Sequence, residues 1–450
     1  MTKSATLGDA VATNTRRREA GLLALVGAVI ASLYVLASIG AKGHLPARLW
    51  LFLGVMFGLM YAMHRIIRHY APNSSELLLP LAALLNGIGF IEISRWNPVR
   101  AQYQAAWTLI SVLGVWAVLK FVRQIRDLDR YRYLTLVSAI ALLMMPLIPH
   151  VGLSSSLTGG ARLWVGFGPI TFQPVEISKI LLALFFASYF ASNKEMLAMP
   201  TRSLGGRFII DPRILLPVLA AWGMAIAVLG LENDLGFAML LFALFLSLLW
   251  VTTGRLSYVV GGMGLIAGGG FIAAQFFYQV HQRVGVWLNP WGHWYDHGGY
   301  QILGGWFSLA SGGLTGTGVG LGVSGRWVSE ITSDMIFAAI GEELGLIGII
   351  FVLSALLLIV AQGFKIAQRT HSDFSRLAAI SLSVILAFQA FFISAGILRL
   401  LPLTGITFPF VAYGGSSLVA NYVMLALLLK ISNENALSTS GGRVRSDLFV

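Results

Sequence analysis

Ionisable residues lie inside or beside long apolar segments of this chain. Glu176 and Lys179 are spaced i and i+3 in an apolar run that begins at Pro174, so a helix places both on one face. An ionisable residue within a membrane span is costly, and it normally pairs or lines a cavity. The spacing therefore predicts either an ion pair that fixes helix packing or a Lys179 that meets an anionic group.

Three further polar residues come close to apolar segments. Arg162 offers a planar fork for phosphate or carboxylate. Trp164 is a membrane-interface anchor or a stacking surface for a sugar, and sequence alone favours the anchor. Asp234, in the run E-N-D-L-G, is an N-cap for the next helix or a member of a polar cluster with Glu176 and Lys179.

The longest polar connection, residues 279–333, runs into Asp334 at the mouth of an apolar segment. It contains Arg283, the nearby Trp287, Trp291 and Trp294, and a glycine-rich stretch, Ser311 to Gly322, that permits tight turns and close backbone approach. Loops of this length are usually functional or disordered, and this one has too many large apolar residues for disorder. Asp334 is a fair helix cap, but an acidic residue at a dry mouth can also serve as a general base.

The segment from Arg399 to Ser417 contains two prolines and a glycine pair, which predict a broken span. Broken helices are tolerated only against protein or a cavity. Ser416 and Ser417 are candidates for bonding to the freed carbonyls. The chain shows no order of Ser, His and Asp typical of a hydrolase triad and no HExxH metal spacing.

The composition indicates a membrane protein. Hydrophobic residues make up 57% of the chain and charged residues 11%, against about 25% charged in soluble domains. The net charge of +12 does not indicate nucleic acid, because the positive residues fall mostly in short loops on one side. The absence of cysteine excludes disulfides and thiol catalysis.

We therefore predict an all-α polytopic membrane protein with about 12 transmembrane helices. About 20 apolar residues span a bilayer as a helix. The predicted spans are Glu19–Gly40, Leu49–His69, Glu76–Ile93, Ala101–Phe121, Tyr131–His150, Pro174–Ala191, Ile214–Leu231, Asp234–Val251, Leu256–Tyr278, Asp334–Gln362, Phe374–Ile397 and Gly405–Ile431. The seventh and eighth spans form a helical hairpin that turns at residues 232–234.

Counting charges orients the chain. With a cytoplasmic N-terminus, 22 of the 31 Lys and Arg residues fall on the cytoplasmic side and 8 on the other, with Lys179 inside a helix. This bias places both termini in the cytoplasm. The long 279–333 loop, between the ninth and tenth spans, is then extracytoplasmic, as are the 160–173 loop and the 232–234 turn.

The predicted organisation has three parts. Residues 1–75 form a cytoplasmic N-terminus and the first two predicted transmembrane helices, and residues 76–431 form the rest of the membrane-spanning region. Residues 432–450 are polar and small, and they predict a disordered cytoplasmic tail.

Several motifs together resemble the SEDS family of FtsW, RodA and SpoVE peptidoglycan polymerases. The likeness covers roughly residues 80–431 in consistent order. Its motifs are G-A-R-x-W (160–164), F-Q-P-x-E-x-x-K (172–179), N-D-L-G (233–236), R-V-x-x-W-L-N-P-W (283–291), G-Y-Q-I (299–302), S-G-G-L-x-G-x-G-x-G (311–320), D-M-I-F-A-A-I-G-E-E-L-G (334–345) and P-L-T-G-I-T-F-P-F-V-A-Y-G-G-S-S (402–417).

The resemblance implies a peptidoglycan glycosyltransferase that polymerises lipid II into β-1,4-linked glycan at the outer face of the bacterial plasma membrane. It implies a catalytic role for Asp334. It places the family's polar cavity on Glu176, Lys179 and Asp234, with Arg162 and Trp164 nearby. The family has ten spans, so residues 1–75 look like an addition.

The resemblance also implies partners. These are lipid II, an undecaprenyl-diphosphate-linked disaccharide-pentapeptide, membrane lipid, and a class B penicillin-binding protein that crosslinks the strands, but no nucleic acid. Arg162, Lys179, Arg283 or a divalent cation (Mg or Mn) would balance the charge of the leaving diphosphate, with no organic cofactor. Ser416 completes the candidate substrate-binding residues.

The alternative function is a flippase or transporter of lipid-linked cell-wall precursors, since broken spans and buried charges suit it too. A non-enzymatic scaffold is a third interpretation. No inverted repeat is evident, and the distinctive residues gather at one membrane face, which favours the enzyme. Elongation and division stay open, with a lean to elongation.

Overall fold

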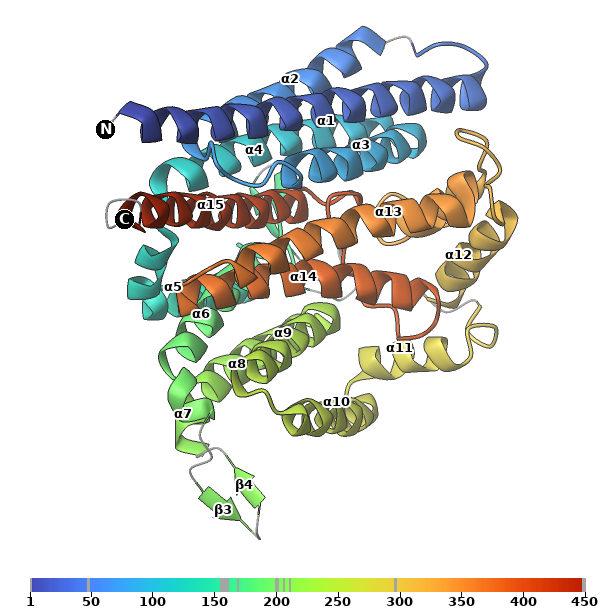
Figure 1. Ribbon diagram of the computed structural model, residues 1–450. Coiled ribbons are helices and arrows are strands. Elements are labelled where there is room, and N and C mark those ends of the chain that lie inside the picture. Colours follow the sequence, from blue (N-terminus) through green and yellow to red (C-terminus); the bar gives the residue numbers. More distant parts are fainter. Residues whose placement is uncertain are drawn as a thin grey trace. The chain divides into compact units, whose positions relative to one another are not determined.

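The computed structural model describes residues 2–46, 49–153, 162–167, 170–198, 202–204, 207–209, 212–294 and 298–446 (Figure 1). In these ranges the chain is almost wholly helical, and its few strands are short. Eleven helices of the described residues are long and apolar enough to cross a membrane. The predicted all-α polytopic class is confirmed.

Packing divides the chain into two compact units, which interleave in sequence. Unit 1 contains residues 1–125, 300–371 and 407–450, and unit 2 contains residues 126–299 and 372–406. The sequence-based boundary at residue 75 stays a prediction.

Unit 1 pairs the N-terminal helices with the helices that follow them. Helix α1 packs on α3 and α2 on α4, while α13 packs on α3 and α15 on α4 (Figure 1). Small residues permit these close approaches. A Cβ atom at Gly87 of α3, for example, would lie 2.2 Å from the Ile30 side chain of α1. The helices are α1 (Thr2–Lys42), α2 (Leu49–Tyr70), α3 (Leu78–Trp96), α4 (Pro98–Phe121), α12 (Gly299–Gly312), η3 (Ser324–Arg326), α13 (Ile336–Gln368) and α15 (Gly415–Ser446).

Unit 2 is built around α6, which packs against α5, α9 and α14. Its core is aromatic: Phe186 and Phe190 of α6 contact Phe245 of α9, which stacks on Trp222 of α8. The elements are η1 (Ile125–Tyr131), α5 (Arg132–Met144), η2 (Met145–Leu147), β1 (Val165–Phe167), β2 (Ile170–Phe172), α6 (Val175–Ser192), α7 (Lys194–Ala198), β3 (Arg202–Leu204), β4 (Arg207–Ile209), α8 (Pro212–Glu232), α9 (Leu235–Thr253), α10 (Leu256–Phe276), α11 (Tyr278–Leu288) and α14 (Asp373–Ile397).

Two details of the predicted spans are settled by the structure. The helical hairpin is confirmed: α8 ends at Glu232, Asn233 adopts a left-handed conformation with φ of 63°, and α9 begins at Leu235. The predicted span Tyr131–His150 is wrong as a single long helix. Helix α5 ends at Met144 and gives way to a 3₁₀ turn that contains Pro146, a residue that cannot donate a helical hydrogen bond.

The connection from residue 279 to 333 is not one loop. It contains α11, α12 and η3, joined by turns. Its apolar residues lie on the faces of these helices, whereas the sequence predicted a non-helical connection.

The predicted disordered tail begins too early at residue 432. Helix α15 continues through this region, and its polar side chains hold neighbouring loops. Ser432 Oγ accepts from the Ser75 amide at 3.0 Å, Asn433 Oδ1 from the Asn73 amide at 2.9 Å, and Glu434 from the Ile125 amide at 2.9 Å. These residues are polar because they satisfy backbone groups, not because the chain is disordered there. Residues 447–450 of the predicted tail lie outside the described residues.

Candidate functional site

Asp334 lies in a turn immediately before α13 and is half-buried. Helix α13 begins at Ile336, and its N-cap position is Met335, whose side chain makes no capping hydrogen bond. Asp334 is therefore not the helix cap that its type would suit. The turn is closed by the Glu330 carbonyl, which accepts hydrogen bonds from the Ser333 and Met335 amides at 3.1 Å each.

Arg100, at the start of α4, forms hydrogen bonds with this turn. Its guanidinium donates to both carboxylate oxygens of Glu330, at 2.9 and 3.3 Å, and to Thr332 Oγ1 at 2.7 Å. Ser333 Oγ donates to the same Glu330 carboxylate at 2.8 Å. Asp334 lies within electrostatic range of Arg100. We call Arg100, Glu330, Thr332, Ser333 and Asp334 the Asp334 cluster.

The Glu330 carboxylate stays ionised within this cluster. Partial burial alone would raise its pKa, but the hydrogen bonds from Arg100 and Ser333, together with the charge of Arg100, hold that pKa below its ordinary value. The cluster therefore contains a fixed cation and a fixed anion beside Asp334.

The segment after α14 is attached to the same turn. The Tyr413 amide donates to the Thr332 carbonyl at 2.8 Å, and the Tyr413 ring lies under the Arg100 guanidinium, 5.3 Å from its centroid. Ser416 is buried in the first turn of α15. Thr407 Oγ1 donates to Ser417 Oγ at 2.7 Å, so Ser417 bonds to a side chain and not to the carbonyl that the sequence predicted.

The glycine-rich stretch packs on the part of α13 that contains Glu342 and Glu343, which follows Asp334 in the sequence. The amides of Thr317 and Gly318 donate to the carbonyls of Glu342 and Glu343, at 2.8 and 3.1 Å. A Cβ atom at Gly316 would lie 2.1 Å from the Glu343 carbonyl oxygen, and its φ of 84° is one that side chains disfavour. The predicted close backbone approach is confirmed here.

The side chains of Glu342 and Glu343 are fully engaged in holding this stretch. Glu342 accepts from the Val323 and Ser324 amides at 2.9 and 3.0 Å, and Glu343 accepts from the Gly320 amide at 2.7 Å. Glu343 also forms an ion pair with Arg95 of α3. Both carboxylates are buried and position the loop; they are not exposed to act on a substrate.

Unit 2 carries a second set of polar groups. Glu176 and Lys179 form an ion pair on α6, one of the two alternatives that their spacing predicted, and each is only 1% exposed. The Lys179 ammonium also lies 5.5 Å from the centroid of the Phe237 ring. A buried pair of this kind gains from mutual attraction only if both partners remain in place.

Asp234 caps α9, as its position predicted, and also belongs to this polar set. Its Oδ1 accepts from the Phe237 amide at 3.0 Å, while its Oδ2 is buried without a hydrogen-bond partner. Burial raises the pKa of Asp234 to about 6, against the lowering effect of the Phe237 amide and the charge of Arg283. The charge of Glu176 also reaches Asp234 and raises its pKa further.

Arg283, on α11, completes the second set. It donates to the Thr404 carbonyl at 3.2 Å in the segment after α14. We call Glu176, Lys179, Asp234 and Arg283 the Lys179 cluster. It places two cations and two acidic groups within one compact unit.

Arg162 and Trp164 lie at the edge of unit 2. The Arg162 amide donates to the Glu232 carbonyl at 3.2 Å, which joins this strand segment to the end of α8, and its side chain is exposed. Trp164 is half-buried, and its carbonyl accepts from the Leu153 amide at 2.9 Å. Both residues precede the β1–β2 hairpin, in which Val165 pairs with Phe172.

Sequence reasoning missed Arg100 and Arg95, which it only counted as charges. The one available signal was their place at the junction of two spans, on either side of Asn97-Pro98, where Asn97 caps α4. No group of three or more His, Cys, Asp or Glu side chains that could hold a metal ion occurs among the described residues.

A family model matches most of the chain. The model of FtsW, RodA and SpoVE, described as a cell cycle protein, matches residues 86–437.

The chain belongs to this family.

Curated family members are similar over most of the chain. The peptidoglycan glycosyltransferase RodA of Mycobacterium leprae is 37% identical over 431 residues, which cover 93% of this chain and 90% of that protein. RodA of Mycobacterium tuberculosis H37Rv is 39% identical over 380 residues, 82% of this chain and 80% of that protein. A probable FtsW from Geobacter sp. strain M18 is 31% identical over 294 residues, 65% of this chain and 76% of that protein.

Solved structures of family members share the fold. One chain, from work described as "Structural coordination of polymerization and crosslinking by a peptidoglycan synthase complex", matches with a TM-score of 0.63 and 23% identity. That match covers 80% of this chain and 98% of the other. The rod shape determining protein RodA of Thermus thermophilus matches with a TM-score of 0.57 and 22% identity, over 80% of this chain and 97% of the other.

Proposed function

We propose that this chain is a peptidoglycan glycosyltransferase that polymerises lipid II into β-1,4-linked glycan. Its curated relatives carry that enzyme name. The observation that carries the proposal is the setting of Asp334: the residue lies just before α13, is half-buried, and is held in a turn that Arg100 fixes. Such a carboxylate has the position and the support that a general base needs.

In the proposed reaction, the 4-hydroxyl oxygen of the acceptor sugar attacks the anomeric carbon of the donor sugar. A new carbon–oxygen bond forms there while the bond to the diphosphate oxygen breaks. Asp334 takes the hydroxyl proton, and the lipid diphosphate leaves with the bonding electron pair. Attack from the face opposite the leaving group inverts the configuration, which gives the β-linkage.

The departing diphosphate needs positive charge. Lys179 and Arg283 are the cations of the Lys179 cluster. Arg162, which precedes Lys179 in the sequence, is an exposed cation. Fixed cations stabilise developing negative charge without reorganisation. We assign the electrostatic role to these residues, with Trp164, Asp234 and Ser416 as the remaining candidate contacts to substrate.

A divalent cation is a further candidate for this role. Mg²⁺ is usually held by one or two carboxylates together with substrate phosphates, not by a cage of protein ligands. The described carboxylates, which form no group of three, fit only a cation that arrives with the diphosphate. It would supply additional charge neutralisation.

We propose a transpeptidase, a class B penicillin-binding protein, as the partner. One solved relative belongs to a peptidoglycan synthase complex that couples polymerisation to crosslinking. We also propose a role in cell elongation, because the mycobacterial RodA proteins are similar over more of the chain than the Geobacter FtsW. The charge bias supports a plasma-membrane orientation with both termini in the cytoplasm.

The test is polymerisation of radiolabelled lipid II by purified protein in detergent. We expect Asp334→Ala to lower the rate by roughly two to four orders of magnitude, the usual loss for a general base. Asp127→Ala, which removes an exposed carboxylate of η1, is the matched control and retains most of the activity. A wild-type rate from Asp334→Ala removes Asp334 from the mechanism, and no glycan from the wild-type chain, with its partner present, favours the flippase.

A further inference from the structure

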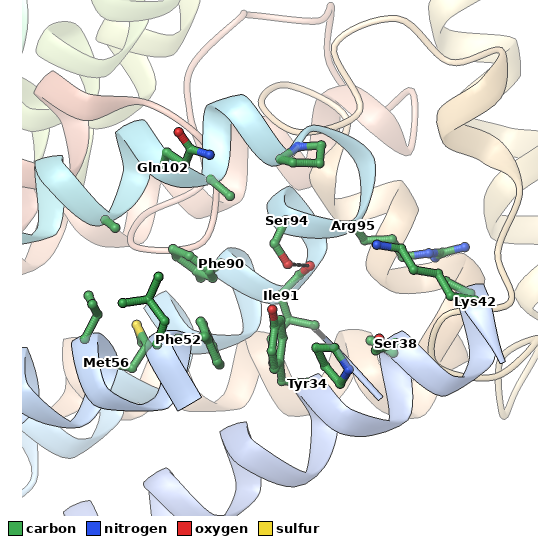
Figure 2. Close-up of a pocket in the computed structure, with 18 residues that line it drawn as sticks. Tyr34, Ser38, Lys42, Phe52, Met56, Phe90, Ile91, Ser94, Arg95 and Gln102 are labelled. Carbon is green, nitrogen blue, oxygen red and sulfur yellow. Dashed lines mark hydrogen bonds between the residues drawn. The ribbon is translucent and has the colours of Figure 1, made fainter. Parts of the chain in front are cut away.

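A cavity of about 440 Å³ lies between the two N-terminal helices and the pair α3 and α4, all within unit 1 (Figure 2). This volume falls in the range of roughly 300–1,000 Å³ typical of ligand pockets. Its walls are mostly apolar. Tyr34 stacks on Phe52 with ring centroids 3.9 Å apart, and Phe52 contacts Phe90 at 5.0 Å.

The cationic groups of the cavity gather at one end. Lys42 is the last residue of α1, and Arg95 lies in the last turn of α3, so both mark the same end of these helices (Figure 2). Arg95 is already engaged by Glu343 and the Gly322 carbonyl. Lys42 is exposed, and it forms no ion pair with any residue in the described part of the chain. It is therefore the cation available to a ligand.

The cavity opens on an apolar rim. Leu51 and Val55 of α2 line it and are 62% and 37% exposed. Both lie on a helix that can span a membrane, where exposed apolar side chains face acyl chains. A hydrocarbon chain can therefore enter from the bilayer, and its headgroup would lie at the level of the helix ends, beside Lys42.

From these features, we propose that the cavity binds an anionic glycerophospholipid, with an acyl chain against Tyr34, Phe52 and Phe90 and a phosphate beside Lys42. Lys42 carries the positive charge that attracts such a phosphate, and it lies at the end of α1, at the level where the headgroup would lie. The family's lipid-linked substrate is a poorer match. Ten of the eighteen lining residues precede residue 86, where the family model begins, so a substrate common to the family does not require them.

The cavity walls are packed against the glycine-rich stretch that leads toward Asp334. A Cβ atom at Gly40 of α1 would lie 2.4 Å from the Val319 carbonyl oxygen, and one at Gly320 would lie 2.3 Å from the Ala37 carbonyl oxygen. Arg95 meets Glu343, the residue that binds the Gly320 amide. A lipid bound in the cavity therefore contacts the same helices, α1 and α3, on which this stretch packs.

The experiment is native mass spectrometry of the full chain in detergent, titrated separately with dioleoyl phosphatidylglycerol and dioleoyl phosphatidylcholine. We expect wild-type protein to retain one phosphatidylglycerol in preference to phosphatidylcholine. Ala105→Phe fills the cavity and abolishes this retention, whereas Ala106→Phe, on the exposed side of the same helix, leaves it unchanged. Lys42→Gln weakens it by roughly fivefold, the effect of one cation at a membrane surface.

Lys120→Gln, at the other end of α4 and away from the cavity, is the control for charge, and it leaves the retention unchanged. Equal retention of the two lipids overturns the proposal, as does equal loss in Ala105→Phe and Ala106→Phe. If Ala105→Phe fails to fold, the comparison of Lys42→Gln with Lys120→Gln decides. Displacement of the phosphatidylglycerol by undecaprenyl diphosphate assigns the cavity to the substrate's lipid and also overturns it.

Discussion

The Asp334 cluster and the Lys179 cluster differ in how exposed their acidic groups are and in the direction in which the pKa of each is shifted. Glu330 is 49% exposed and paired with an Arg100 that is 32% exposed, and its pKa lies below the ordinary value. Asp234 is 7% exposed, and burial raises its pKa to about 6. The first cluster can exchange protons with water, as a catalytic base must, while the second holds charges in a dry interior, where they act by electrostatic attraction.

The largest effect expected from this contrast follows removal of Lys179. Lys179→Met leaves Glu176 buried without its cation, and breaking a buried pair in this way costs about 3–5 kcal/mol. The double variant Glu176→Gln/Lys179→Met regains most of that stability, because no uncompensated charge remains. Thermal unfolding in detergent, followed by tryptophan fluorescence, measures both.

Lys194→Met provides the surface control for that measurement. Lys194 and Asp373 form an ion pair in which the side chains are 42% and 43% exposed. Exposed pairs contribute about 0–1 kcal/mol, so the variant unfolds close to the wild-type temperature. A Lys179→Met protein as stable as the double variant would contradict the buried-pair account.

The next effect is the pH dependence that Asp234 imposes on stability. Its folded pKa of about 6 lies above the unfolded value of about 4, so the folded state binds the proton more tightly. The resulting stabilisation is fully present below about pH 4 and is lost as the pH rises through about 6. Asp234→Asn removes up to about 3 kcal/mol of this dependence, since each pKa unit is worth about 1.4 kcal/mol.

Unfolding temperatures of wild type and Asp234→Asn, measured from pH 4 to pH 8, check this expectation. Their difference should change between about pH 4 and pH 6 and then stay constant. A difference that is the same at every pH would show that Asp234 titrates normally.

The smallest effect is expected for Arg100. Arg100→Gln loses the paired hydrogen bonds to Glu330, so the turn that carries Asp334 is less well held. Charge-assisted hydrogen bonds contribute about 1.5–3 kcal/mol, and less at this exposure, so we expect turnover of lipid II to fall by about tenfold with little change in KM. An unchanged turnover would show that Arg100 does not position the base.

Local spacing and residue type were enough to predict the Lys179 cluster in part. The i, i+3 spacing predicted the Glu176–Lys179 pair, and the E-N-D-L-G run predicted the hairpin and the Asp234 cap. These features depend on a single helix or turn, so the sequence specifies them directly. The glycine-rich stretch was also identified as a place of close backbone approach, as Gly316 shows.

Contacts between distant segments could not be predicted in the same way. Arg100 reaches Glu330 across 230 positions, and Arg95 reaches Glu343 across a similar separation. In the sequence, only their places on either side of Asn97-Pro98 set them apart from other cations near the ends of spans. The cavity beside Lys42 depends likewise on how α1 and α2 pack on α3 and α4, which no local pattern encodes.

Labelling of position 334 tests the central claim, that Asp334 is a catalytic carboxylate on the outer membrane face, most directly. The chain contains no cysteine, so Asp334→Cys introduces a unique thiol, and Arg126→Cys provides a control expected on the cytoplasmic side. We predict that a membrane-impermeant maleimide labels the Asp334→Cys protein in intact cells and the Arg126→Cys protein only after permeabilisation. Labelling of Asp334→Cys only after permeabilisation would contradict the account.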